Sequence, residues 1–94
     1  MTDEKMLQVV AELETMLAAR RLHLAGVSDL ASVREAQSAR VQHINTMFPR
    51  LRTLIAEGKR EKAMRWIGFI QGAFWALGDA TLDALKAMNR SEDA

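Results

Sequence analysis

Six cationic residues gather around one predicted turn, and they are the strongest candidates for chemistry in this sequence. They are Arg50, Arg52, Lys59, Arg60, Lys62 and Arg65. Arginine side chains fork onto phosphate oxygens, and the free N–H groups at a helix start bind anions. The indole of Trp66, the next residue, could stack on a base. The pattern therefore allows binding of a phosphate-bearing ligand, either a signalling nucleotide or nucleic acid.

A structural interpretation of the same residues competes with this one. Trp66 falls on an apolar face of its predicted helix, which favours a place in the core. Glu57 and Glu61 lie among the cations, as at many solvated helix ends. The isoelectric point of about 8.2 is below the value of about 9 that is usual for nucleic-acid-binding domains. Anion binding is therefore the alternative function and not the leading one.

Residues with the spacing of a catalytic or metal site are scarce. His23 and His43 lie twenty residues apart, and there is no cysteine to supply a thiolate or a metal ligand. No nucleophile elbow, zinc-protease motif or nucleotide-binding glycine motif occurs. We predict a protein that is not an enzyme and has no metal site and no cofactor. Two pairs of carboxylates lie close in sequence, but neither indicates acid–base catalysis. Glu12 and Glu14 point to different faces of a helix, and helix capping explains Asp79 and Asp83.

Length and composition favour one soluble domain. The chain has 94 residues, of which 49% are hydrophobic and 27% charged, with a net charge of +1. We assign residues 1–94 to a single domain. The first residues are acidic, unlike a secretion signal, and the longest nearly uncharged stretch, 66–78, has thirteen residues where a membrane span needs about 20. We predict a cytoplasmic protein without membrane contact.

Apolar residues recur with the period of an α-helix along most of the chain. Gly26, Gly58 and Gly78 are expected to end helices. We predict an all-α fold, a small bundle of three to four helices at 2–25, 29–57, 59–77 and 79–89, with a polar tail at 90–94. In the first two helices the core positions are expected to be Met6, Val10, Leu13, Leu17, Leu24, Val41, Ile44, Phe48, Leu51 and Ile55.

Pro49 interrupts the second predicted helix without changing its apolar phase. The three- and four-residue spacing continues from Val41 to Ile55, which favours one long helix bent at Pro49. Proline has no backbone N–H, so the carbonyl of Asn45 would lose its partner. The alternative is that a new helix starts near Asn45 or Thr46, with the proline in its first turn.

The third predicted helix is apolar on all sides. One face carries small residues at four-residue intervals, Gly68, Gly72 and Ala76, flanked by Met64 and Trp75. Two glycines inside a helix cost about 2 kcal/mol relative to alanine, so we expect another backbone to come close. The opposite face is expected to form the core, and its bulky members are Trp66, Phe69, Ile70, Ala73, Phe74 and Leu77.

A chain this short cannot easily cover such a helix on both sides, and self-association would cover it. We predict a homo-oligomer, with a two-fold dimer favoured. The alternative is that the first helix fills the small-residue groove within one chain. The candidate interface residues are Trp66, Gly68, Phe69, Gly72, Trp75 and Ala76.

The C-terminal half contains a distinctive block from Lys62 to Gly72, of the form K-A-x-R-W-x-G-F-x-Q-G. This block, together with His43 to Asn45, Phe48-Pro49 and Gly78, resembles a group of small bacteriophage and prophage proteins of unknown function. Thr81 to Lys86 continues the likeness. The sequence departs from the group at Ile67, where leucine is common, and at Ala84, where an acidic residue is common. The resemblance implies a phage origin and a helical, non-enzymatic protein, and it assigns no functional residue.

These observations lead to one principal functional prediction. We expect a phage-encoded interaction protein in the cytoplasm of a bacterial host cell, which binds and modulates a host defence, regulatory or replication protein. Trp75 is the preferred anchor if the small-residue groove faces a partner. The alternative is a protein that binds phosphate-bearing ligands through the six cations from Arg50 to Arg65, which we call the basic turn.

Overall fold

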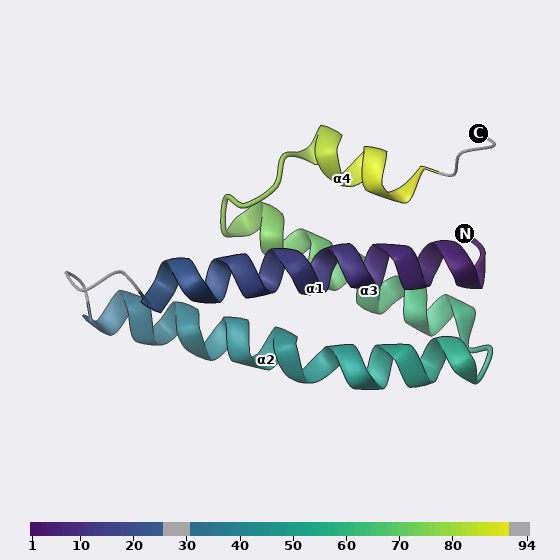
Figure 1. Cartoon of the computed structure of the whole chain (residues 1–94), viewed down its shortest axis with the longest axis horizontal. Coiled ribbons are helices and arrows are strands. Elements are labelled where there is room, and N and C mark those ends of the chain that lie inside the picture. The colour runs from purple at the N-terminus through teal and green to yellow at the C-terminus, as the bar shows by residue number, and fades with distance from the viewer. Residues whose placement is uncertain (26–30, 91–94) are drawn as a thin grey trace.

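The residues that the structure describes form four helices (Figure 1). The computed structural model describes residues 1–25 and 31–90, and their side chains except those of residues 22–25 and 31–38. The helices are α1 (Asp3–Ala25), α2 (Ala31–Ala56), α3 (Arg60–Ala76) and α4 (Leu82–Asn89). No strand occurs in the described ranges, so the predicted all-α fold is confirmed. The predicted start of the second helix at residue 29, the turn glycine Gly26, the side chains of His23 and Leu24, and the tail beyond Arg90 lie outside the described residues.

The helices form two layers. The two long helices α1 and α2 run antiparallel side by side, α3 crosses behind α1, and α4 turns back over α1 (Figure 1). The Cα positions extend 45 × 27 × 17 Å. Packed helices lie about 8–10 Å apart, so a thickness of 17 Å holds only two layers. Among the described residues, no third layer covers the side of α3 that points away from α1 and α2.

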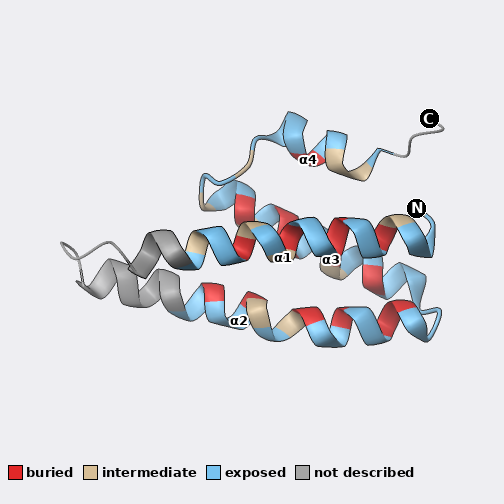
Figure 2. Ribbon diagram, in the orientation of Figure 1, coloured by how far each residue is buried: buried red, intermediate tan, exposed pale blue. Residues whose placement is uncertain are grey.

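The core lies where α1, α2 and α3 meet (Figure 2). Every apolar position predicted for the first two helices is buried, except Leu24, whose side chain is not described. Val9 and Leu54 are buried as well, which widens the apolar stripe of each helix. The helices α1 and α2 therefore pack along the seams that their spacing predicts.

Pro49 lies inside α2, which continues without a break from Ala31 to Ala56. Phe48 and Leu51 on either side of it are both buried, so the apolar phase is kept across the proline. The prediction of one long helix is confirmed, and the alternative of a new helix near Asn45 is wrong.

Two glycines end helices in the same way. Gly58 has φ 74° and Gly78 has φ 82°, a left-handed conformation that glycine adopts without strain. After Gly58, the N–H of Lys59 donates to the carbonyl of Leu54 at 2.9 Å, which is the Schellman pattern of a helix end. After Gly78, the N–H of Asp79 donates to the carbonyl of Phe74 at the same distance. These turns set the directions of α3 and α4.

The fourth helix starts three residues later than predicted. Its N-cap is Thr81, whose hydroxyl accepts a hydrogen bond from the N–H of Ala84 at 3.1 Å. Asp79, for which helix capping was predicted, instead accepts a hydrogen bond from Arg20 of α1 at 2.9 Å. The carboxylate thereby ties the turn before α4 to α1.

Candidate interaction surface

The buried face of α3 differs from the predicted one. Ile70 and Phe74 are buried as expected, but Phe69 is 58% exposed. Ile67, which was not expected in the core, is only 2% exposed. Trp66, Ala73 and Leu77 are partly buried against the core. The helix is thus rotated so that the side with Ala63, Ile67 and Phe74 meets α1 and α2.

The opposite side of α3 is exposed and largely apolar. Met64, Phe69 and Trp75 are 41%, 58% and 54% exposed, although each is a large hydrophobic side chain. We call this surface the outer face of α3, and its members are Met64, Gly68, Phe69, Gly72, Trp75 and Ala76. Of the predicted interface residues, all lie on this face except Trp66, which packs against the core.

No part of the described chain fills the groove at the two glycines of α3. A Cβ atom built on Gly68 or Gly72 meets nothing within 4 Å, apart from the helix itself. The first helix packs on the other side of α3, against its buried residues. The alternative in which the first helix occupies the groove is therefore wrong. Neither glycine is required by a close approach within one chain.

The docking of α4 leaves the outer face open. Gln71 is 6% exposed, and its amide exchanges two hydrogen bonds with the amide of Asn89 at 2.6 and 3.0 Å. Leu85 adds a buried apolar contact from α4. On a helix of 3.6 residues per turn, Gln71 lies beside Trp75, so α4 borders the outer face along one edge. This amide pair was not predicted from the sequence, although Gln71 is the lone uncharged polar side chain within α3.

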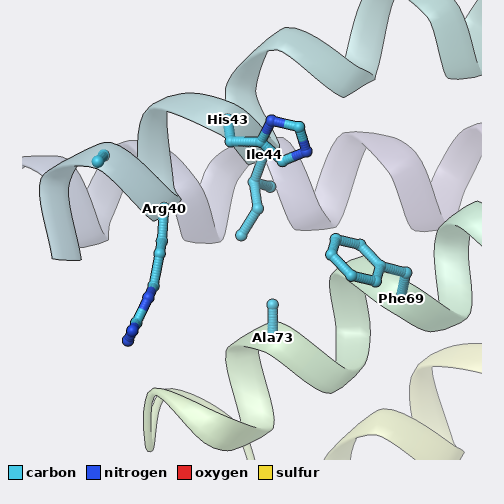
Figure 3. A pocket seen from close by; sticks show the side chains of 6 residues that line it. Arg40, His43, Ile44, Phe69 and Ala73 are labelled. Atoms are coloured by element: carbon cyan, nitrogen blue, oxygen red, sulfur yellow. The ribbon is translucent and has the colours of Figure 1, made fainter. Parts of the chain in front are cut away.

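A hollow of about 340 Å³ borders the other edge of the outer face. Figure 3 shows Ile44 of α2 and Phe69 and Ala73 of α3 facing the same space, with the His43 ring at its rim. Ala39 and Arg40 complete the lining. Because α2 and α3 contribute residues distant in sequence, no local motif marks this hollow.

The basic turn is only partly assembled as predicted. Lys59, Arg60, Lys62 and Arg65 border one shallow hollow of about 380 Å³ at the start of α3, together with Glu61. Arg50 and Arg52 are not among the residues that line it.

Three of the six cations contact carboxylates. Arg60 binds Asp3 at 3.0 Å, and Lys59 binds Glu57 at 3.2 Å. Arg52 binds Glu14 of α1. All three pairs are exposed, so each contributes little to stability but lowers the positive potential at the turn. The carboxylates of Asp3 and Glu14 lie beside the basic turn because α1 packs there. Spacing along the sequence does not reveal this contact.

The remaining polar candidates do not converge on a site. In the part of the chain that the structure describes, no three histidine or acidic side chains are placed to hold a metal ion. Glu14 and Asp79 each bind an arginine, and His43 is exposed at the rim of the α2–α3 hollow. Among the described helices none is long and apolar enough to span a membrane.

Comparisons with family models, curated proteins and solved structures gave no match to the chain. The resemblance to small bacteriophage proteins therefore stays a prediction. The evidence for the candidate surface is therefore its geometry, an apolar helix face that the described part of the chain leaves uncovered.

Proposed function

We propose that this protein is a non-enzymatic interaction protein of bacteriophage origin, which binds and modulates a protein of the bacterial host. It acts in the host cytoplasm as a homodimer, on a defence component, a regulator or a replication factor. The outer face of α3 is the contact surface. Trp75 is its main anchor, because it is a large exposed apolar side chain and tryptophan is enriched among binding hot spots.

One observation carries this proposal. Three large apolar side chains stand exposed around two glycines that have open space above them. Glycine inside a helix costs about 1 kcal/mol relative to alanine, and the fold itself gains nothing in return at either position. Contiguous exposed apolar patches of this kind mark interaction sites in soluble proteins. Close approach of another protein accounts for both features.

Replacing Gly72 with leucine tests the surface without harming the fold. The new side chain projects into open space and raises helix propensity, so we expect unfolding stability at least equal to that of the original protein. The same side chain blocks approach of another helix, so we expect the dimer to dissociate into monomers of 10.5 kDa. Sedimentation analysis gives the mass, and circular dichroism with urea gives the stability.

Ala18→Leu is the matched control for this variant, because Ala18 is an exposed small residue on α1. We expect Ala18→Leu to leave the dimer mass and host-protein binding unchanged. Gly72→Leu is expected to be monomeric and to lose host-protein binding. A Gly72→Leu protein that keeps the mass of the original and still retains its host partner would show that the outer face is not the contact surface.

The basic turn supports a second candidate function, because four cations share one hollow at a helix start. A labelled single-stranded oligonucleotide and a signalling nucleotide are the ligands to test. If either binds there, the combined change Arg60→Ala and Arg65→Ala should weaken affinity at least tenfold, and affinity should fall steeply with salt. Arg21→Ala with Arg90→Ala removes two exposed cations elsewhere as the control. Binding that is indifferent to salt, or unchanged in the Arg60/Arg65 variant, contradicts this function.

A further inference from the structure

We propose that the α2–α3 hollow is a binding site for a small carboxylic acid with an apolar body, such as a medium-chain fatty acid. The apolar body occupies the hollow, and the carboxylate accepts hydrogen bonds from Arg40 at its mouth. This inference goes beyond the proposed function, because the site is a concave space between two helices and its ligand is not a protein.

The floor of the hollow is apolar. The buried Ile44 of α2 and the partly buried Ala73 of α3 face the same space (Figure 3). Ala39 adds a further apolar side chain from α2. The volume of about 340 Å³ lies near the lower end of the range of about 300–1,000 Å³ that is typical of small-molecule sites. The hollow therefore suits the apolar part of a small ligand.

Phe69 contributes the side of the hollow that belongs to α3. Its ring points across the space toward Ile44, and 58% of the residue is exposed (Figure 3). An apolar chain between Phe69 and Ile44 removes the surface of both the ring and the chain from water, which favours binding.

Arg40 supplies a positive charge at the mouth of the hollow. It is exposed and extends from α2 beside the hollow (Figure 3). None of the ion pairs between described residues involves Arg40. The His43 ring at the rim offers at least one N–H donor in either protonation state. The mouth thus carries donors for an anion, and no described carboxylate lines the hollow.

The helix segments that flank the hollow are free of acidic residues. From Arg40 to Ala56, α2 contains three arginines and no acidic residue. From Lys62 to Ala76, α3 contains two cations and no acidic residue. The basic turn differs, because Asp3 and Glu57 contact two of its cations. Both helices therefore contribute positive potential at the hollow, which favours a negatively charged ligand.

A single carboxylate matches these groups better than a nucleotide does. A guanidinium forms two parallel hydrogen bonds with one carboxylate, and the charge of Arg40 balances one negative charge. A nucleotide carries several negative charges and a polar sugar and base, to which Ile44, Phe69 and Ala73 offer no polar side-chain atom. An apolar acid instead places its polar atoms at the mouth and its apolar atoms against the floor.

The hollow and the outer face of α3 are separate sites. Of the described residues that line the hollow, only Phe69 belongs to both, and four of the others are residues of α2. Binding of an acid in the hollow and binding of a host protein to the outer face can therefore be tested, and can fail, independently.

Titration with octanoate tests the site, and octanol is the matched neutral ligand with the same chain length. We expect octanoate to bind with a dissociation constant of about 0.1–1 mM, as for an efficient ligand of about ten non-hydrogen atoms. Octanol should bind about threefold more weakly or worse, and acetate, which lacks the chain, should show no binding. Amide chemical shifts in NMR spectra give the affinities, and the largest shifts should occur around Ile44, Phe69 and Ala73.

Two variants separate the charge from the hollow. Arg40→Gln should weaken octanoate binding about three- to tenfold and leave octanol binding unchanged, because it removes only the charged hydrogen bonds. Ala39→Phe fills the hollow from an exposed position and should weaken both ligands about threefold or more. The matched controls are Arg50→Gln on the same helix and Ala18→Phe on α1, both exposed and outside the lining of the hollow. Neither control should change either affinity by more than about twofold.

Equal affinities of the original protein for octanoate and octanol would overturn the inference, since Arg40 would then select no anion. Equal weakening of octanoate by Arg40→Gln and Arg50→Gln would overturn it for the same reason. An Ala39→Phe protein that binds octanoate as tightly as the original would show that the chain does not occupy the hollow. Absence of any shift up to about 10 mM octanoate would also overturn the inference and leave host-protein binding by the outer face untouched.

Discussion

Replacing Phe74 with alanine is expected to remove about 3–5 kcal/mol of the free energy of unfolding. The Phe74 side chain has no exposed surface, and it lies on the side of α3 that packs into the core. Its removal leaves a cavity that neighbouring helices cannot fill without shifting. Small domains have roughly 5–15 kcal/mol of stability in total, so the variant should be partly unfolded at 37 °C. Urea denaturation followed by circular dichroism measures the loss.

Phe69→Ala is the matched control, since it removes the same side chain from the same helix. Phe69 is 58% exposed, so we expect its loss to cost the monomer less than about 1 kcal/mol. The same change should weaken the dimer, because Phe69 belongs to the outer face. Equal destabilisation by the two changes would mean that α3 buries both phenylalanines, as the sequence alone predicts, and that the rotation of α3 described above is wrong.

The position of Phe69 shows what the sequence could not determine. In α1 and α2, polar residues occupy one side of each helix, so the spacing of Met6 to Leu17 and of Val41 to Ile55 was sufficient to identify the buried stripe. In α3, large apolar residues occur on every side. The buried face is then chosen by the shapes of α1 and α2, which supply no signal within α3 itself. The prediction placed Phe69 in the core for this reason.

The uncovered side of α3 was predicted more accurately than its buried side. The glycines Gly68 and Gly72, together with Trp75, were expected to face a partner or the first helix, and they lie on one uncovered side. Glycine in a helix interior is costly, so its position carries information that apolar side chains do not. Trp66 was expected on the core face and was also named among the candidate interface residues. Its side chain packs against the core.

Contacts between distant residues account for what sequence reasoning missed. The carboxylates of Asp3 and Glu14 reach the basic turn only because α1 and α2 are antiparallel. The amide pair of Gln71 and Asn89 joins α3 to α4 in a comparable way. A polar residue within an apolar helix is a signal that a partner exists, but it does not identify that partner.

Replacing Pro49 with alanine is expected to stabilise the protein by about 2 kcal/mol. A proline inside a helix costs about 3 kcal/mol relative to alanine, because it lacks an N–H and its ring crowds the carbonyl of the preceding turn. Here α2 continues through Pro49, and the proline side chain is exposed, so its removal sacrifices no core packing. Proline also restricts the unfolded chain, and losing that restriction offsets up to about 1 kcal/mol of the gain.

For a domain of this size, about 2 kcal/mol corresponds to a rise in melting temperature of roughly 8–16 °C, which calorimetry detects readily. Arg50→Ala is the control, because Arg50 is the neighbouring exposed residue of the same helix, and we expect it to change stability by less than about 0.5 kcal/mol. The gain in stability requires that α2 still packs against α1 once the N–H of residue 49 donates a hydrogen bond to the carbonyl of Asn45. Phe48 and Leu51 are buried on either side of the substitution and would be displaced if the helix straightened. A lower melting temperature for Pro49→Ala would therefore show that the proline shapes α2 to the core and is not a tolerated defect.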